Sequence, residues 1–409
     1  MRRAAAAAVL LTALAGCDPA TPVVVVDAEP APRALSRPDA VLPVSDDFPS
    51  QTPGARPPVE TDEGGLWMRV DNIENEIRTA GNRVHDPELN RYVHGIVCEL
   101  AGPWCPDIRT YILRVPAFNA SMAPTGLMQV WTGLLLRCRD EAQLAAILGH
   151  EIGHYVRRHS IQLWRDARNK TDFLVFFQIA LAAARIPFAS DAVSYGLIGS
   201  IYMFSRDAER EADRIGLALM SRAGYDPHAV PAIWRQLIRE DDADKDKGPR
   251  MYYFATHPTA SERLRTLDRM ADAVQGARDD RGVERYRAKI APYRMDWVRD
   301  ELALRRFDRL EALLDLMAED GANPAETAYA RGELFRLRDK EGDSDKALAS
   351  LQAAAAAVGA PPEALRSLGL VQLRRGDRTA ARAAFAGYLA RQPQAGDRAM
   401  IEALIAAPG

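Results

Sequence analysis

The 409-residue chain has little of several features that mark common classes of protein. Its formal net charge is only −3 and no basic stripe runs along it, so nothing points to a nucleic-acid partner. No second Cys or His pair accompanies Cys98 and Cys105, which argues against a metal site at that pair. The chain also lacks an apolar run long enough to span a bilayer. Its composition, with 47% hydrophobic and 27% charged residues, is typical of a globular protein with a sizeable core.

The N-terminus carries the pattern of an export signal. Two arginines precede an apolar stretch over residues 4–13, and small residues follow. The sequence Leu14-Ala15-Gly16-Cys17 resembles a bacterial lipobox, which implies that residues 1–16 are a lipoprotein signal peptide and that Cys17 is lipidated. The lipid would anchor the protein in the periplasm of a Gram-negative bacterium, on either the inner or the outer membrane. A plain secretory signal with a chance cysteine is the alternative.

Length and composition divide the rest of the chain. A chain of this length is expected to form two or three units. Residues 17–65 are rich in Pro, Ala and Asp, and we interpret them as a flexible tether. Helical apolar spacing follows, and strand-like alternation begins near residue 108. The sequence predicts a mainly α-helical domain with a small β-sheet (an α+β fold) over residues 66–275, followed by an all-helical domain over residues 276–409.

Two short strands are expected to form a hairpin at the edge of the sheet. Apolar side chains alternate over residues 111–115, and a Pro-Thr-Gly turn at residues 124–126 separates two further strand-like stretches. Proline cannot donate to a strand ladder, which favours an edge position.

The cysteines predict one covalent loop. Cys98 and Cys105 are close enough in sequence to form a disulfide in an oxidising compartment. Cys138 is expected to be a buried free thiol.

Residues 173–184 are strongly apolar but too few to span a bilayer. We interpret them as a helix in the core or over the active site. Shallow insertion into a membrane, or contact with membrane-protein substrates, is the alternative.

The region after residue 276 is rich in Ala, Leu and Arg, and its spacing resembles that of tetratricopeptide repeats. One run opens at Pro362, and an earlier run from Pro324 fits more loosely. The run that opens at Pro362 matches the repeat at Leu368-Gly369, Gly376, Ala381, Phe385 and Pro393. Such a solenoid would offer a concave face to protein partners rather than perform chemistry. An unrelated helical bundle is the alternative.

The run His150-Glu151-Ile152-Gly153-His154 has the residues for metal chemistry. Residues four apart on a helix lie about 6 Å apart on one face, so both histidines can reach one Zn²⁺. Glu151 can face a metal-bound water as a general base. Such strings also occur by chance. Here the acids at residues 140–141 suit the N-terminus of a helix, and a helix is what the metal-binding interpretation requires. Gly153 costs roughly 1 kcal/mol of helix propensity relative to Ala, which is reasonable where another group must approach the backbone closely.

A catalytic zinc needs a third protein ligand, and the acidic residues at 207–213 can supply it. Glu209 and Glu211 project about 200° apart on a helix, so only one of them can face the metal. Asp213 lies one turn after Glu209 and can accept the second N–H of a ligand histidine, which favours Glu209. Glu211 and Asp207 are therefore expected on a solvated face.

With these residues the chain resembles the membrane-associated zinc peptidases that include HtpX, the CAAX prenyl endopeptidase and the periplasmic BepA. The resemblance covers about residues 119–263 and rests on His150–His154, Ser205–Asp213 and the segment from His257 to Arg263. It implies a zincin-type metallopeptidase domain over residues 66–275. In this family the residue matching Glu209 is the third ligand of one Zn²⁺.

The same resemblance implies roles for two further residues. His257 would gate the metal or stabilise the oxyanion, and Arg263 would lie beside it. The chain departs from HtpX and the prenyl endopeptidase in lacking spanning helices. A periplasmic peptidase followed by tetratricopeptide-like repeats is most similar to BepA-like members.

The sequence therefore predicts a zinc-dependent endopeptidase that degrades misfolded or stalled envelope proteins. Substrate would add as an extended strand along the edge strand, at Asn119, Ala120, Ser121 and Met122. Further proteins would bind the helical repeats. One alternative is a chaperone-like binding module with a silent or structural metal site. Another, a prenyl-protein peptidase, is disfavoured by the missing spanning helices.

Overall fold

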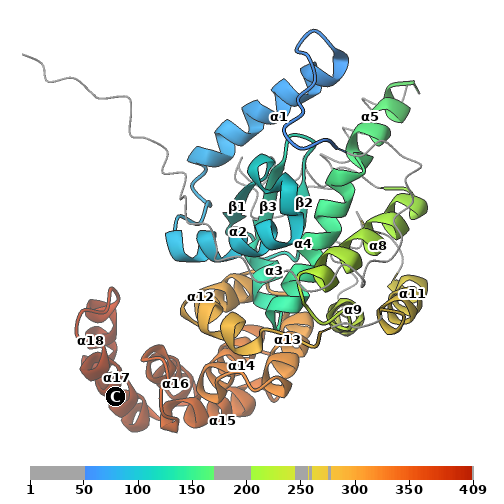
Figure 1. Ribbon diagram of the computed structural model, residues 1–409. Coiled ribbons are helices and arrows are strands. Elements are labelled where there is room, and N and C mark those ends of the chain that lie inside the picture. Colours follow the sequence, from blue (N-terminus) through green and yellow to red (C-terminus); the bar gives the residue numbers. More distant parts are fainter. Residues whose placement is uncertain (1–50, 170–203, 245–256, 258–259, 275–277, 408–409) are drawn as a thin grey trace, which may run out of the picture. The chain divides into compact units, whose positions relative to one another are not determined.

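The computed structural model describes residues 51–169, 204–244, 257, 260–274 and 278–407 (Figure 1). The expected signal peptide, Cys17, most of the tether and the apolar segment 173–184 lie outside these residues. Among the described helices, none combines the length and the apolar character that crossing a membrane requires.

Residues 51–65, expected to belong to the tether, make contacts with the rest of the described chain and include the start of a helix. The buried Gln51 donates its backbone N–H to the Val156 carbonyl at 2.7 Å, and its own carbonyl accepts the Trp104 indole N–H at 2.7 Å. Helix α1 (Asp62–Thr79) then begins at a Thr61 cap, whose side chain accepts from the Gly64 N–H. The tether prediction missed this docking because proline-rich composition says nothing of long-range contacts.

The sheet has three strands in the order β1-β3-β2, namely β1 (Arg109–Leu113), β3 (Leu127–Trp131) and β2 (Ala120–Met122). Strands β2 and β3 pair antiparallel with Ser121 opposite Gln129, so the predicted hairpin at a sheet edge is confirmed. Strand β1 pairs parallel with β3, which the sequence did not predict. Strand β2 is therefore an edge strand of the sheet.

The core around the sheet is made by helices that precede and follow residues 170–203. Those preceding it are α2 (Pro87–Ala101), η2 (Gly102–Asp107), α3 (Thr132–Arg137), α4 (Glu141–Val156) and α5 (His159–Asn169). Those following it are α8 (Arg206–Arg222), α9 (Ala229–Ala243) and α11 (Ala260–Asp272). Every residue of α4 is buried, and this helix contacts α2, α8, α9 and β2.

Helix α4 begins where the acids predicted it. The Asp140 side chain accepts the Gln143 N–H at 2.8 Å and so satisfies one of the free donors of the first turn. The Glu141 carboxylate is buried and accepts from Tyr92, Tyr225 and Arg285. The N-terminus of α4 is thus held by its cap and by residues from distant elements.

Helices α4 and α8 approach so closely that side chains are excluded from their contact. A Cβ atom on Gly153 would lie 2.9 Å from the Ala212 carbonyl oxygen, and one on Gly216 would lie 2.8 Å from the His150 nitrogen. The close approach inferred from Gly153 is therefore present, and it packs α8 closely against the C-terminal half of α4. Figure 1 shows the two helices side by side.

The C-terminal region is helical, as predicted. Its helices are α12 (Val283–Ala303), α13 (Phe307–Glu319), α14 (Pro324–Arg338), α15 (Asp343–Ala356), α16 (Glu363–Arg374), α17 (Arg378–Arg391) and α18 (Arg398–Ala406). From α13 to α18, each helix packs against the next in chain order. A Cβ atom on Gly332 would lie 2.5 Å from the Leu351 side chain, and one on Gly369 would lie 2.5 Å from Phe385.

Two further features bear on the prediction and on stability. Cys98 and Cys105 are joined by a disulfide, and Cys138 is a buried free thiol.

The fully buried Arg137 of α3 contacts Glu240 of α9 at 2.7 Å and Glu301 of α12 at 2.6 Å. This charged cluster connects the helices around the sheet with the first helix of the C-terminal region.

Candidate metal centre

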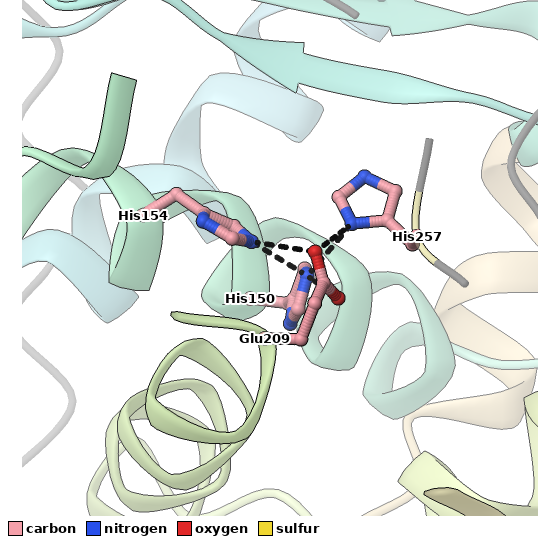
Figure 2. Close-up of side chains that lie close together, drawn as sticks. All are labelled: His150, His154, Glu209 and His257. Atoms are coloured by element: carbon pink, nitrogen blue, oxygen red, sulfur yellow. Dashed lines mark hydrogen bonds and ion pairs between the residues drawn. The ribbon is translucent and has the colours of Figure 1, made fainter. Parts of the chain in front are cut away.

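Three elements bring polar side chains to one buried point. His150, Glu151 and His154 come from the middle of α4. Glu209 comes from the first turn of α8, which begins at Ser205, whose side chain caps the helix by accepting from the Ala208 N–H. His257 lies three residues before α11. Figure 2 shows the two α4 histidines, Glu209 and His257 converging.

The distances within this cluster suit a single metal ion. The Nε2 atoms of His150 and His154 are 3.0 Å apart. Glu209 Oε1 lies 3.5 Å from His154 Nε2, and Glu209 Oε2 lies 3.6 Å from His150 Nε2. Ligand atoms held about 2.05 Å from one tetrahedral Zn²⁺ are about 3.3 Å apart. Two imidazole nitrogens and one carboxylate are also a donor set that zinc favours, so these residues fit the ion that the sequence predicts.

The charge states of these side chains favour metal binding. Burial holds the pKa of His154 well below its ordinary value and also lowers the pKa of His150, so both rings keep a lone pair. Burial alone would raise the pKa of Glu209, but the charges of His257 and Arg263 outweigh it and hold that pKa well below its usual range. The cluster therefore offers neutral nitrogens and an anionic oxygen.

Glu151 differs from Glu209 in charge state. Burial, assisted by the neighbouring charge of Glu209, raises the pKa of Glu151 to about 7. The Met122 backbone N–H on β2 donates to the Glu151 carboxylate, and His257 Nε2 lies 3.6 Å from Glu151 Oε1. A carboxyl group whose pKa lies near neutrality suits the transfer of protons in both directions.

Asp213 and Arg263 lie immediately behind the cluster. Asp213 Oδ1 is 3.0 Å from His150 Nδ1, the ring nitrogen that faces away from His154. Arg263 donates to both Asp213 oxygens, at 2.6 and 2.8 Å, and lies 2.8 Å from Glu209 Oε2. The guanidinium also lies over the Trp234 ring, 4.2 Å from its centroid. Arg263 thus orients the carboxylates of Glu209 and Asp213.

His257 lies against the same point from the opposite side. Its Nδ1 is 2.8 Å from Glu209 Oε1 and 3.4 Å from His150 Nε2. Burial alone would lower the pKa of His257, but the charge of Glu209 outweighs it and raises that pKa. The structure therefore adds a fourth group with metal-ligand chemistry to the three from the helices.

Sequence reasoning missed two residues near His154 and misjudged a third. His159 Nδ1 lies 2.9 Å from His154 Nδ1, and the Phe204 ring stacks on His154 with centroids 3.9 Å apart. Glu211, expected on a solvated face, is only 8% exposed and lies 2.8 Å from Arg157 and 3.1 Å from His159. The helical-wheel argument excluded Glu211 from the metal but could not show that another histidine would cover it.

Asp207 is exposed, in agreement with its expected solvated position. The one sequence signal for His159 was its occurrence five residues after His154 in a chain with only seven histidines.

The predicted substrate strand lies beside Glu151 and is buried. Asn119, Ala120, Ser121 and Met122 are each at most 3% exposed. Among the residues that the structure describes, the side-chain amide of Asn119 and the hydroxyl of Ser121 have no hydrogen-bond partner. Buried polar groups of this kind normally find partners.

Comparison with known proteins finds a family model that matches part of the chain. Residues 84–271 match the model of peptidase family M48. The chain is 35% identical over 170 residues to the mitochondrial metalloendopeptidase OMA1 of Schizosaccharomyces pombe, a match that covers 41% of this chain and 48% of the relative. It is 34% identical over 214 residues to human OMA1, covering 50% of this chain and 40% of the relative.

A third relative is bacterial. The chain is 26% identical over 211 residues to a putative beta-barrel assembly-enhancing protease of Vibrio cholerae, covering 49% of this chain and 42% of that protein. The matches thus span less than half of the length of each of these relatives.

Proposed function

We propose that the chain is a zinc-dependent endopeptidase that degrades misfolded or stalled proteins of the bacterial cell envelope. The match of residues 84–271 to the model of peptidase family M48 supports this proposal. The observation that carries this proposal is the buried cluster of His150, His154 and Glu209, with Glu151 adjacent to it. The similarity to OMA1 metalloendopeptidases and to beta-barrel assembly-enhancing proteases supports it.

In this proposal His150, His154 and Glu209 hold one Zn²⁺ per chain. A zinc ion bound there would polarise the scissile carbonyl and acidify a water molecule. Glu151 takes the proton of the attacking water on its carboxylate and passes it to the nitrogen of the leaving amine. The raised pKa of Glu151 supports this double role, because both its protonated and its ionised forms are accessible near neutral pH.

His257 and Arg263 act around the same centre. His257 Nδ1 lies 2.8 Å from Glu209 Oε1 and 3.4 Å from His150 Nε2. It would take the position left open beside a bound zinc ion and would restrain cleavage until substrate displaces it. Arg263 keeps Glu209 and Asp213 in place and adds positive charge beside the developing oxyanion.

Substrate binds along Asn119 to Met122 of the edge strand β2. Among the described strands, β2 pairs on one side only, with β3, and its Met122 N–H donates to Glu151. A peptide strand added along its other side would pass the reacting groups. Main-chain hydrogen bonds give such binding little sequence selectivity. The unpartnered side chains of Asn119 and Ser121 would then find partners on the incoming chain.

The envelope location is part of the proposal. It rests on the lipobox-like sequence ending at Cys17 and on the similarity to beta-barrel assembly-enhancing proteases, whereas other relatives are named as mitochondrial. A lipid anchor on Cys17 would hold the peptidase domain at a membrane surface in the periplasm.

The helical region of residues 276–409 would select which proteins reach the site. The tight contacts of Gly332 with Leu351 and of Gly369 with Phe385 support tetratricopeptide-like helix pairs, in which a small residue on one helix admits a large side chain from the next.

Removal of the metal tests the proposal. The purified chain is expected to contain one zinc ion, to cleave a reduced and unfolded protein, to lose cleavage with a chelator and to regain it with added zinc. A chain that cleaves equally well after complete zinc removal would contradict the proposal.

One observation favours a second candidate, a chaperone-like module with a structural zinc. His257 completes a set of four ligand-type side chains, and closed four-ligand sites are typical of structural zinc. The variant His257→Ala separates the two. Increased cleavage with zinc retained supports a gated peptidase, whereas unfolding or loss of zinc supports the structural site.

A further inference from the structure

His154 is connected to a second line of buried polar residues that leads away from the cluster. Its Nε2 faces His150, and its Nδ1 lies 2.9 Å from Nδ1 of His159. The other nitrogen of His159, Nε2, lies 3.1 Å from Glu211 Oε2. Arg157 Nη2 lies 2.8 Å from the second oxygen, Glu211 Oε1. These side chains are all buried, so water does not replace the contacts.

The chemistry of imidazole determines which nitrogen of each ring donates a hydrogen bond and which accepts one. A neutral histidine that binds a metal through Nε2 carries its proton on Nδ1. His154 therefore donates to His159, which accepts at Nδ1 and must carry its own proton on Nε2. That proton is donated to Glu211, which also forms an ion pair with Arg157. Only one tautomer of His154 and one of His159 allow both of these hydrogen bonds to form.

Each of the two histidines of α4 is thus connected to a carboxylate–arginine pair, His150 directly and His154 through a further histidine ring. His150 contacts Asp213 directly, and Asp213 is held by Arg263. His154 reaches the carboxylate–arginine pair of Glu211 and Arg157 only through the ring of His159.

The backbone makes this longer path available. Arg158, between α4 and α5, has a φ of 56°, a left-handed conformation that side chains other than glycine rarely adopt. The turn it makes brings His159 back against His154.

We propose that His159 and Glu211 are positioning residues that hold the His154 ring in the tautomer and orientation required for zinc binding. The inference rests on the proposed function, because it takes the cluster of His150, His154 and Glu209 to be the zinc site. Partners of this kind commonly change metal affinity by about 10- to 100-fold.

The test measures zinc affinity by competition with a chromophoric chelator, using the full chain. His159→Phe keeps an aromatic ring but removes the acceptor, and it is expected to weaken zinc binding by about 10- to 100-fold. His159→Asn keeps an acceptor near the Nδ1 position and is expected to recover part of that loss. The visible spectrum of the Co²⁺-substituted protein should shift in His159→Phe, because the His154 ring is no longer held in place.

A matched control and a second variant guard against a purely structural effect. Asp207→Asn removes an exposed carboxylate one helical turn from Glu211 and should leave affinity and spectrum unchanged. If His159→Phe does not fold, Glu211→Gln decides, because it keeps volume and one acceptor oxygen while removing the charge. A several-fold loss of affinity in this variant supports the proposal.

Folded variants of His159 or Glu211 with wild-type zinc affinity and an unchanged Co²⁺ spectrum would overturn the inference. This outcome is distinguishable from failure of the proposed function. A wild-type chain that binds zinc but cleaves no protein contradicts the peptidase proposal, while the affinities of the variants still decide the roles of His159 and Glu211.

Discussion

Single residues around the cluster differ in how far the sequence could predict them. The positions of His150, His154, Glu209 and Asp213 follow from helical spacing, because each pair lies on one helix and faces one side. The role of His257 came only from a family resemblance, since a loop histidine has no periodicity to place it. The contact between His159 and Glu211 could not be predicted from the sequence, because it depends on how α5 and α8 pack on α4.

The pH dependence of cleavage is a prediction at this scale. Burial raises the pKa of Glu151 to about 7, and a general base works only when ionised. A bound zinc ion adds positive charge nearby and lowers this value, so the midpoint should lie below 7. We expect kcat/KM to fall about tenfold per pH unit on the acid side of that midpoint. A pH profile with zinc kept saturating checks this, and a rate that rises steadily as the pH falls from 7 to 5 would contradict it.

At the level of elements, the crossing of α4 and α8 makes the cluster possible. Glu209 reaches the α4 histidines because Gly149, Gly153 and Gly216 let the two backbones approach. The sequence indicated that something must approach Gly153, but not that Ala212 of α8 would do so. The parallel pairing of β1 with β3 was also unpredictable, because strand alternation is the same for either direction.

The substitution Gly153→Ala tests the crossing. Its Cβ would lie 2.9 Å from the Ala212 carbonyl oxygen and 3.1 Å from the Ala212 Cα, so α8 must shift. We expect a loss of about 1–3 kcal/mol in the free energy of unfolding and weaker zinc binding, measured by denaturant titration and chelator competition.

The matched control for this substitution is Gly95→Ala in α2, where an added Cβ meets no atom within 4 Å. It should raise the free energy of unfolding by about 0.5–1 kcal/mol through helix propensity. The crossing would be unimportant if the two substitutions changed stability and zinc affinity alike.

Across the described part of the molecule, buried charge connects the core around the sheet to the C-terminal helical region. Arg137 bridges Glu240 and Glu301, and Arg309 of α13 lies 3.4 Å from the other Glu301 oxygen. Composition indicated separate units on either side of residue 276, but it contained no sign of this connection. Charged residues in helices are usually solvated, so the sequence offered no reason to bury these.

The connection predicts a large effect of one substitution. Glu301→Gln leaves the buried Arg137 with a single anionic partner, and we expect the free energy of unfolding to fall by about 3 kcal/mol. Asp296→Asn, which changes an exposed carboxylate on the same helix, is the control and should alter stability by less than about 0.5 kcal/mol. Equal unfolding midpoints in urea for both variants would contradict the account of this cluster.

The central claim is that Glu151 performs the proton transfers at a zinc site that it does not itself form. The most direct measurement compares zinc content and cleavage of an unfolded protein between the wild-type chain and Glu151→Gln. The account predicts one zinc ion per chain in both proteins and at least a 100-fold loss of cleavage in the variant. A Glu151→Gln protein that retains zinc and cleaves at the wild-type rate would contradict the account.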